Sequence, residues 1–319
     1  MIVGYGILDL SIQIGDFKLK NPISLASGTA GYGEELAVFM DISRIGAIFT
    51  KGISLEPRRG NRGPRIVETP SGVLNSIGLE NIGLNRFLKE KLPFLLERGA
   101  TVIPNIAGYS IDENVELCRI LSNTNGIPAV ELNVSCPNVS KGGMAFGREM
   151  NIFSKLIKRV RRTTDKVLIV KLSPNVADVV EFASAAKDLG ADAVSAVNTY
   201  LGMKIDIERR KPLFFNKVAG LSGPAIRPLA VRTVYEIFDR VDIPIIGIGG
   251  ITDIDDVIEF IMAGASVISI GTMNMINPRA GIECLENLEE YMEIRGINSM
   301  HELIGSAHKG FNKKQWSEI

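Results

Sequence analysis

This chain of 319 residues has few cysteines, few histidines and no excess of either charge. Cys118, Cys136 and Cys284 show no paired spacing, which argues against a disulfide framework or a metal site. Lysine plus arginine and aspartate plus glutamate both number 36, so no overall field would attract nucleic acid or an anionic membrane. No apolar run approaches the roughly 20 residues of a membrane span, and the N-terminus lacks the basic start of a signal peptide. We expect a cytoplasmic protein that binds neither nucleic acid nor membrane.

Apolar, β-rich segments alternate with amphipathic segments along the whole chain. Eight of the apolar segments are predicted to be strands: residues 23–27, 47–51, 101–105, 129–134, 167–172, 193–198, 244–248 and 266–270. Eight units of strand followed by helix predict an α/β fold of the (β/α)₈ barrel type, with residues 1–319 as one domain. An open, doubly wound sheet is disfavoured, because no G-x-G-x-x-G motif follows the first strand.

The connections between these segments carry further signals. Residues 7–20 predict a hairpin that turns at Gly15 and Asp16 and closes the bottom of the barrel. The run from Ser110 to Glu113 has the sequence of a capping box at the start of a helix. Three connections that follow strands are long, namely 52–81, 137–149 and 199–225. Long loops in a compact domain are usually functional, and these three belong to the face where barrels keep their active sites.

Polar or glycine residues stand where each predicted strand ends. In chain order they are Ser27, Lys51, Gly52, Asn105, Asn133, Lys171, Asn198, Thr199, Gly249, Gly250, Gly271 and Thr272. A buried polar group without a partner costs roughly 1–3 kcal/mol. One such residue is commonly a satisfied structural group, but a full set at one mouth indicates a ligand site.

The glycines after strands seven and eight indicate a phosphate site. Gly249, Gly250 and Gly271 leave bare backbone where barrels commonly bind phosphate. The helix that opens after Gly223 offers further N–H donors. Glycines in either motif alone are equally well explained by tight turns, whereas the pair in register favours phosphate.

The two lysines at strand ends need a negative group nearby. Lys171 follows four apolar residues, and a buried ammonium is costly without a counter-charge. The neighbouring strand ends offer almost no Asp or Glu, so we expect the counter-charge for Lys171 and Lys51 to be a reduced flavin or a substrate carboxylate. A flavin-free phosphate-binding barrel lyase, with either lysine as a Schiff-base amine, is the alternative from another enzyme class.

Cys136 is the leading candidate for a proton-transfer residue. It lies between asparagines just after the fourth strand, and no strand end offers His, Asp or Glu. Cys118 and Cys284 occupy apolar stripes and are interpreted as core residues.

Three motifs together resemble one known family. They are N-S-I-G-L at residues 75–79, N-V-S-C-P-N at 133–138 and Asn198-Thr199, and they accompany the two glycine motifs. Over residues 21–311 the chain resembles the soluble class 1 dihydroorotate dehydrogenases. The resemblance implies that dihydroorotate is oxidised to orotate in pyrimidine (UMP) biosynthesis, with Cys136 removing the C5 proton while the C6 hydride goes to FMN.

The resemblance also implies the residues that bind each ligand. FMN would be held by Ser27, Lys51, Gly52, Asn105, Asn133, Lys171, Val197, Gly223, Gly249, Gly250, Gly271 and Thr272. The pyrimidine would be held by Lys51, Asn75, Ser76, Ile77, Gly78, Leu79, Asn133, Asn138, Asn198 and Thr199. Asparagine suits an imide-type ring because its side chain both donates and accepts hydrogen bonds.

Residues 67–75 and 200–206 resemble the NAD-linked class 1B. That resemblance implies a partner subunit with FAD and a [2Fe–2S] cluster, which passes electrons to NAD, and a homodimer that binds two such subunits as a heterotetramer. This chain itself has no cysteine cluster and no dinucleotide fingerprint. The fumarate-dependent soluble class is the alternative within the family.

Overall fold

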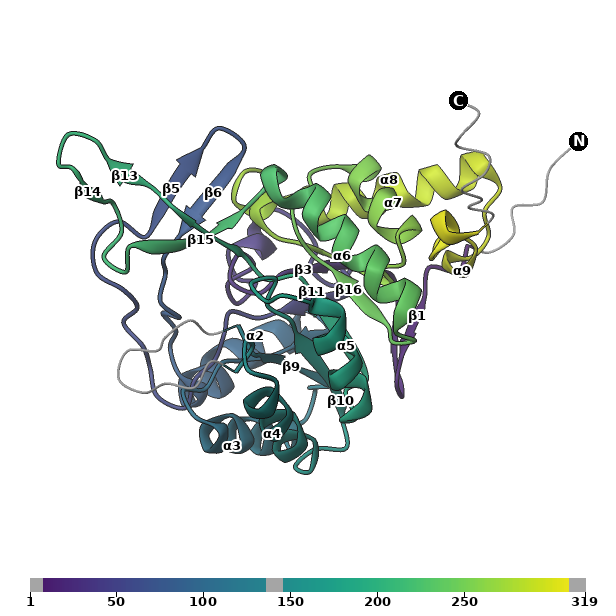
Figure 1. Ribbon diagram of the computed structural model, residues 1–319. Helices are drawn as coiled ribbons and strands as arrows, with labels where there is room; N and C mark the ends of the chain where they lie inside the picture. Colours follow the sequence, from purple (N-terminus) through teal and green to yellow (C-terminus); the bar gives the residue numbers. More distant parts are fainter. Residues whose placement is uncertain (1–7, 136–145, 310–319) are drawn as a thin grey trace, which may run out of the picture.

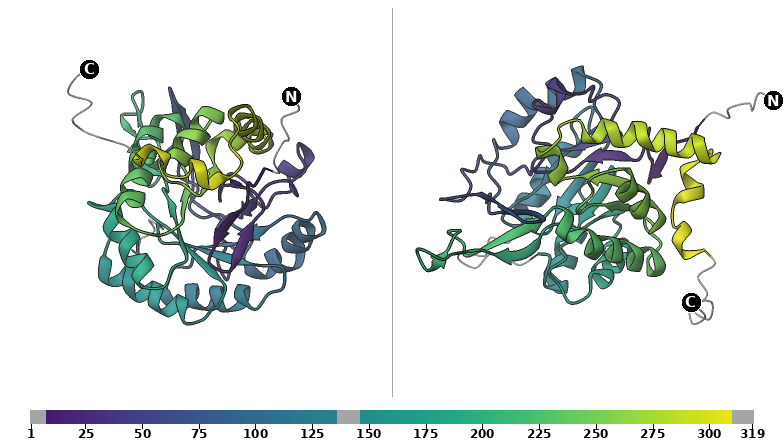
Figure 2. Two further views of the ribbon diagram at one scale, coloured as in Figure 1. Left: turned by 90° about the vertical axis from the view of Figure 1, so that its right-hand side faces the viewer. Right: turned by 90° about the horizontal axis from the view of Figure 1, so that it is seen from above.

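A computed structural model describes residues 8–135 and 146–309. At its centre is a parallel sheet of nine strands in the order β7-β4-β3-β17-β16-β11-β10-β9-β8, and the left view of Figure 2 shows helices arranged around it. The strands are β3 (Ile23–Leu25), β4 (Ala47–Phe49), β7 (Val102–Ile103), β8 (Asn105–Ile106), β9 (Ala129–Asn133), β10 (Val167–Lys171), β11 (Ala193–Ala196), β16 (Ile245–Gly247) and β17 (Val267–Ile270). All eight predicted segments form strands of this sheet.

The sheet closes on itself at Pro104. β7 pairs with β4 and β8 pairs with β9, although the two strands are separated only by this residue. Proline has no backbone N–H to give to a ladder, so a single strand divides there into two short pieces. Because the first and last strands of the sheet order are parts of one segment, the nine strands form an eight-position barrel, and the predicted (β/α)₈ fold is confirmed.

Helices cover the outside of the barrel after most strands. They are α1 (Leu84–Arg86), η2 (Phe87–Lys91), α2 (Leu92–Glu97), α3 (Ile111–Ser122), α4 (Met150–Arg161), α5 (Val179–Asp188), α6 (Arg227–Arg240), α7 (Ile254–Met262) and α8 (Ala280–Arg295). The first unit departs from the expected pattern, since only the short turn η1 (Leu36–Val38) connects β3 to β4. Gly31 and Gly33 precede it with positive φ angles of 56° and 79°, which a continuous helix excludes. No helix in the described ranges is long and apolar enough to cross a membrane.

The predicted N-terminal hairpin is present. β1 (Ile12–Ile14) and β2 (Phe17–Leu19) pair antiparallel, and Gly15 turns with φ 52°. A Cβ on Gly15 would lie 3.2 Å from Val167 at the first residue of β10. The hairpin therefore packs against the N-terminal ends of the barrel strands, as expected.

Two of the long connections form a second sheet. Residues 52–81 supply β5 (Ile66–Thr69) and β6 (Gly72–Asn75), and residues 199–225 supply β12 (Tyr200–Met203) and β15 (Val218–Ser222). Their order is β12-β15-β6-β5, all antiparallel, and a small hairpin, β13 (Ile205–Asp206) with β14 (Lys211–Pro212), extends beyond it. Figure 1 shows this sheet at the end of the molecule away from β1 and from α9 (Met300–Leu303). The remaining elements are the short turns η3 (Pro224–Ile226), η4 (Thr272–Met275) and η5 (Ser306–His308).

Candidate active site

Lys171 and Ser27 join opposite sides of the barrel mouth. Lys171 ends β10 and is 5% exposed, and its Nζ donates to Ser27 Oγ at 3.0 Å. β10 and β3 are separated by three strand positions in either direction around the barrel, so the lysine side chain crosses the centre of the mouth. Two of the predicted ligand-binding residues are thereby brought into contact.

A row of amide side chains lines the same mouth. Asn198 Nδ2 donates to Asn133 Oδ1 at 3.5 Å, and Asn133 Nδ2 donates to Asn105 Oδ1 at 3.4 Å. Backbone N–H groups also hold two of these side chains in place. Ser135 N donates to Asn133 Oδ1 at 3.0 Å, and Thr199 N donates to Asn198 Oδ1 at 2.8 Å. The row therefore presents amide donors and acceptors from β8, β9 and the end of β11 to one space, across the end of β10.

The counter-charge of Lys171 comes from the protein, which corrects the sequence-based expectation. Glu131 lies in the middle of β9, is 0% exposed, and places Oε2 at 4.0 Å from Lys171 Nζ. The same carboxylate accepts from Asn105 Nδ2 at 2.5 Å and from Ser195 Oγ at 2.6 Å. Strand ends alone do not reveal this group, but a glutamate inside an apolar strand is a visible signal.

Lys51 also has an acidic neighbour, contrary to expectation. Its Nζ lies 3.9 Å from Glu80 Oε2, and Arg65 Nη1 contacts the same oxygen at 2.8 Å. Glu80 follows Leu79, which adopts φ 54°. The turn of the predicted substrate segment therefore brings a half-exposed carboxylate to the lysine.

The glycine motifs converge as predicted. A Cβ on Gly250 would lie 2.8 Å from the carbonyl oxygen of Gly223, and one on Gly223 would lie 3.6 Å from Thr272 Cγ2. Gly223, Gly249 and Gly250 have φ angles of 95°, 135° and 81°, which L side chains rarely adopt. Thr272 Oγ1 donates to Ser222 Oγ at 2.9 Å, and Gly271 directly precedes it. At Gly223, Gly249 and Gly250 a Cβ would lie within 2.8 Å of a neighbouring atom, and this bare backbone fits a phosphate group.

The predicted substrate segment borders the amide row. A Cβ on Gly52 would contact both Asn105 Oδ1 at 3.1 Å and Leu79 Cδ2 at 3.6 Å. Asn75 Nδ2 donates to Gly220 O at 3.2 Å, beside Thr199. In the stretch between Asn75 and Leu79, Asn61 Nδ2 donates to the hydroxyl and carbonyl oxygens of Ser76, Asn61 N donates to the carbonyl of Ile77, and Gly78 turns with φ 74°.

Sequence reasoning missed Asn175. Its Nδ2 donates to Thr199 O at 2.9 Å and its Oδ1 accepts from Leu201 N at 2.9 Å. This side chain fixes the backbone that carries Thr199. Burial raises the pKa of the neighbouring Tyr200 phenol, while a side-chain hydrogen bond with Thr233 and the charge of Arg232 lower this pKa.

The remaining predicted residues are placed differently. Val197 is buried and its N–H donates to Ile248 O at 3.0 Å, so it belongs to the wall of the barrel mouth. Cys136 and Asn138 lie outside the described residues. Their predicted roles stay predictions.

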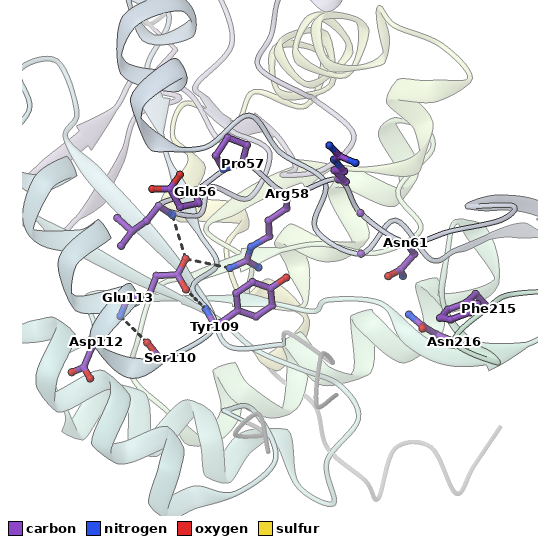
Figure 3. A pocket seen from close by; sticks show the side chains of 14 residues that line it. Glu56, Pro57, Arg58, Asn61, Tyr109, Ser110, Asp112, Glu113, Phe215 and Asn216 are labelled. Atoms are coloured by element: carbon purple, nitrogen blue, oxygen red, sulfur yellow. Dashed lines mark hydrogen bonds and ion pairs between the residues drawn. The ribbon is translucent and has the colours of Figure 1, made fainter. Parts of the chain in front are cut away.

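A separate cavity of about 910 Å³ lies beside the segment 55–61. Glu113 accepts hydrogen bonds from Leu55 N, Arg58 Nη2 and Tyr109 N there, at 3.2, 3.3 and 2.7 Å (Figure 3). The predicted N-cap is confirmed, because Ser110 Oγ accepts from Glu113 N at 3.0 Å, but the Glu113 carboxylate binds Tyr109 N rather than closing the capping box. Among the predicted site residues that the structure describes, only Gly78 borders this cavity.

Comparison with known proteins agrees with this geometry. The family model described as dihydroorotate dehydrogenase matches residues 9–292. A protein of Desulforamulus reducens named dihydroorotate dehydrogenase B (NAD(+)), catalytic subunit, is 48% identical over 94% of this chain and 99% of its own length. A protein of Trichlorobacter lovleyi with the same name is 48% identical over 93% and 98%. A protein of Aquifex aeolicus named putative dihydroorotate dehydrogenase A (fumarate) is also 48% identical, over 95% and 99%. The chain belongs to the dihydroorotate dehydrogenase family.

Proposed function

We propose that this protein oxidises dihydroorotate to orotate, a step of pyrimidine (UMP) biosynthesis, with FMN as its redox cofactor. The observation that carries the proposal is that one barrel mouth holds two features. One is the bare backbone of Gly223, Gly249 and Gly250, here called the glycine cradle, and the other is the row Asn105, Asn133 and Asn198 beside Lys171. Membership of the family supports the flavin, and the names of the relatives support the substrate.

Each group at the mouth has a defined task in this proposal. The backbone around Gly223, Gly250 and Thr272 would hold the FMN phosphate, and Lys171 would place a positive charge at the flavin. When bound, FMN supplies the acceptor for the C6 hydride. The amides orient the pyrimidine, because they donate to and accept from its ring polar groups, and Lys51 would face its carboxylate.

Cys136 is proposed as the base that takes the C5 proton. The motif that contains it follows β9 directly, and β9 ends with Asn133 at the mouth. A thiolate removes such a proton only if it stands within hydrogen-bond reach of C5–H in the complex. The sequence position fits this requirement.

The physiological acceptor is proposed to be NAD⁺. The proteins of D. reducens and T. lovleyi are named as catalytic subunits of NAD(+) enzymes, and a catalytic subunit implies a partner. We propose that this partner carries FAD and a [2Fe–2S] cluster and binds a homodimer of this chain as a heterotetramer in the cytoplasm. Fumarate is the second candidate, because the A. aeolicus relative is equally similar.

An anaerobic absorbance spectrum before and after addition of dihydroorotate tests the reaction. We expect the purified chain, supplied with FMN, to show a flavin spectrum that bleaches with dihydroorotate. A flavin spectrum that stays unchanged would rule out this substrate, and a protein that takes up no FMN would rule out the cofactor. Reoxidation then separates the acceptors, since fumarate turnover by the chain alone contradicts the NAD⁺ assignment.

A further inference from the structure

Glu131 links the amide row to Lys171 beneath the barrel mouth. Its carboxylate receives hydrogen bonds from Asn105 on β8 and Ser195 on β11, and it lies 4.0 Å from the ammonium of Lys171 on β10. Side chains of three strands thus converge on a single acid that is 0% exposed. Because Glu131 has no surface at the mouth, it acts on a ligand only through these neighbours.

The carboxylate determines which way the amides point. An asparagine amide presents either its oxygen or its NH₂ to a neighbour, whereas an ionised carboxylate only accepts. Glu131 Oε2 therefore requires Asn105 to turn Nδ2 inward, which leaves Asn105 Oδ1 to accept from Asn133. Asn133 Oδ1 in turn faces Asn198 Nδ2. One buried acceptor fixes the donor and acceptor order of the whole row.

The same carboxylate balances the charge of Lys171. The only other polar partner of this ammonium among the described residues is the neutral Ser27 hydroxyl. In a water-poor interior, one charge at 4 Å from another changes the potential much more than it does in water. Removal of the carboxylate therefore leaves the ammonium uncompensated at the mouth.

We propose that Glu131 is a positioning residue, which sets the donor and acceptor order of the Asn105–Asn133–Asn198 row and offsets the charge of Lys171 at the cofactor. The inference rests on the proposed function insofar as these residues face FMN. It gives Glu131 an effect on cofactor affinity and on cofactor potential, beyond its part in packing.

Glu131→Gln keeps the size of the side chain but removes the charge and the acceptor-only character. We expect the dissociation constant of FMN to rise about tenfold, as for the loss of a hydrogen bond to a charged group. The midpoint potential of bound FMN should also rise, because an uncompensated positive charge favours the form with more electrons. Flavin fluorescence titration and anaerobic redox titration measure the two quantities.

Ser195→Ala is the matched control. It removes the 2.6 Å hydrogen bond to Glu131 Oε1 but leaves the carboxylate charge and its contact with Asn105. We expect a loss of thermal stability similar to that of Glu131→Gln, with the FMN dissociation constant within about threefold of the wild-type value. Equal FMN affinity and equal potential in the two variants would overturn the proposal.

A polarity swap decides the question even if Glu131→Gln alone does not fold. In Asn105→Asp the new carboxylate faces that of Glu131 across the present 2.5 Å contact, and their repulsion should weaken FMN binding. When Glu131→Gln is added, the glutamine side chain donates an N–H to the new aspartate at position 105. The aspartate can still accept from Asn133 Nδ2, as Asn105 does. The double variant should therefore bind FMN at least about tenfold more tightly than Asn105→Asp alone. A double variant that binds no more tightly, or that does not fold, overturns the proposal.

These outcomes are distinct from failure of the proposed function. A wild-type chain that binds no FMN contradicts the proposed function itself. A wild-type chain that binds FMN but is not reduced by dihydroorotate contradicts only the substrate. Unequal FMN affinities across the Glu131 variants support the positioning role in that second case too.

Discussion

Lys171 Nζ and Ser27 Oγ lie 3.0 Å apart, although their strands stand on opposite sides of the barrel. The contact holds a nearly buried ammonium at the centre of the mouth, where a ligand that enters along the barrel axis meets it. Since an ammonium carries three N–H donors and Ser27 takes one, Lys171 keeps donors for a bound ligand.

Replacement of Ser27 tests the importance of this contact. Ser27→Ala removes the acceptor that holds Lys171 Nζ, so we expect FMN affinity to fall about fivefold, equivalent to ~1 kcal/mol. Ser24→Ala is the control, because Ser24 lies on β3, the strand that leads to Ser27, and its Oγ donates to Ile268 O at 3.0 Å, away from Lys171. Similar FMN affinity in the two variants would show that the lysine is held by other groups.

The glycine cradle predicts a sharp difference between two Gly→Ala changes. Gly250 has φ 81°, and a Cβ there would lie 2.7 Å from Arg227 Cβ and 2.8 Å from Gly223 O. Gly296 has φ 65° but open space around it. Both changes strain the backbone by roughly 1 kcal/mol, but only Gly250→Ala moves the cradle. Equilibrium dialysis should show loss of FMN binding for Gly250→Ala alone, and equal binding in both would exclude the cradle as the phosphate site.

Cysteine reactivity should identify Cys136 as the accessible thiol. Burial raises the pKa of Cys284 to about 12, with Asp253 and Glu283 adding to the effect, and burial also raises the pKa of Cys118. At pH 8 the Cys284 thiolate fraction is then only about 10⁻⁴. Iodoacetamide should modify Cys136 first, as detected by peptide mass spectrometry. Fast labelling of Cys118 or Cys284 in the folded protein would contradict this assignment.

Replacement of Cys136 tests its proposed role as the base. Cys136→Ala should keep FMN bound while flavin reduction by dihydroorotate slows about 10²-fold or more.

The raised pKa of Cys284 also predicts an alkaline loss of stability. The pKa of Cys284 in the folded protein lies above the unfolded value near 9. The stability that the buried Cys284 thiol contributes is therefore fully present below pH 9 and is lost as the pH rises toward about 12. Cys284→Ala removes this dependence. Urea unfolding at pH 8 and pH 10 should show a smaller decrease of stability for the variant than for the wild type.

The strand ends were predictable because parallel strands of a barrel all open to the same face. Glu131 was not assigned, since β9 is buried on both faces and shows no alternation to tell an inward from an outward side chain. The carboxylate at Lys51 was missed for another reason. Glu80 reaches that lysine through a loop whose turn at Leu79 has a positive φ, and sequence patterns do not determine such a conformation.

The most demanding prediction concerns Glu113, which fastens the long connection after β4. Its carboxylate accepts from Leu55 N, Arg58 Nη2 and Tyr109 N (Figure 3). The Arg58 side chain is 6% exposed and stacks on the Tyr109 ring at 3.4 Å. Glu113→Ala leaves the buried Arg58 guanidinium without a counter-charge, so we expect the free energy of unfolding to fall by about 2–4 kcal/mol.

Glu113→Ala should loosen the connection after β4 more than it destabilises the whole protein. Arg59 and Arg62 are exposed on the connection that Glu113 holds, so limited trypsin digestion should cleave there faster in the variant. Glu116→Ala on the same helix removes only an exposed pair with Arg119, which contributes little, and should leave digestion unchanged. If both variants are cleaved at the same rate, the connection is held by its second sheet, β5 and β6 against β15, rather than by Glu113.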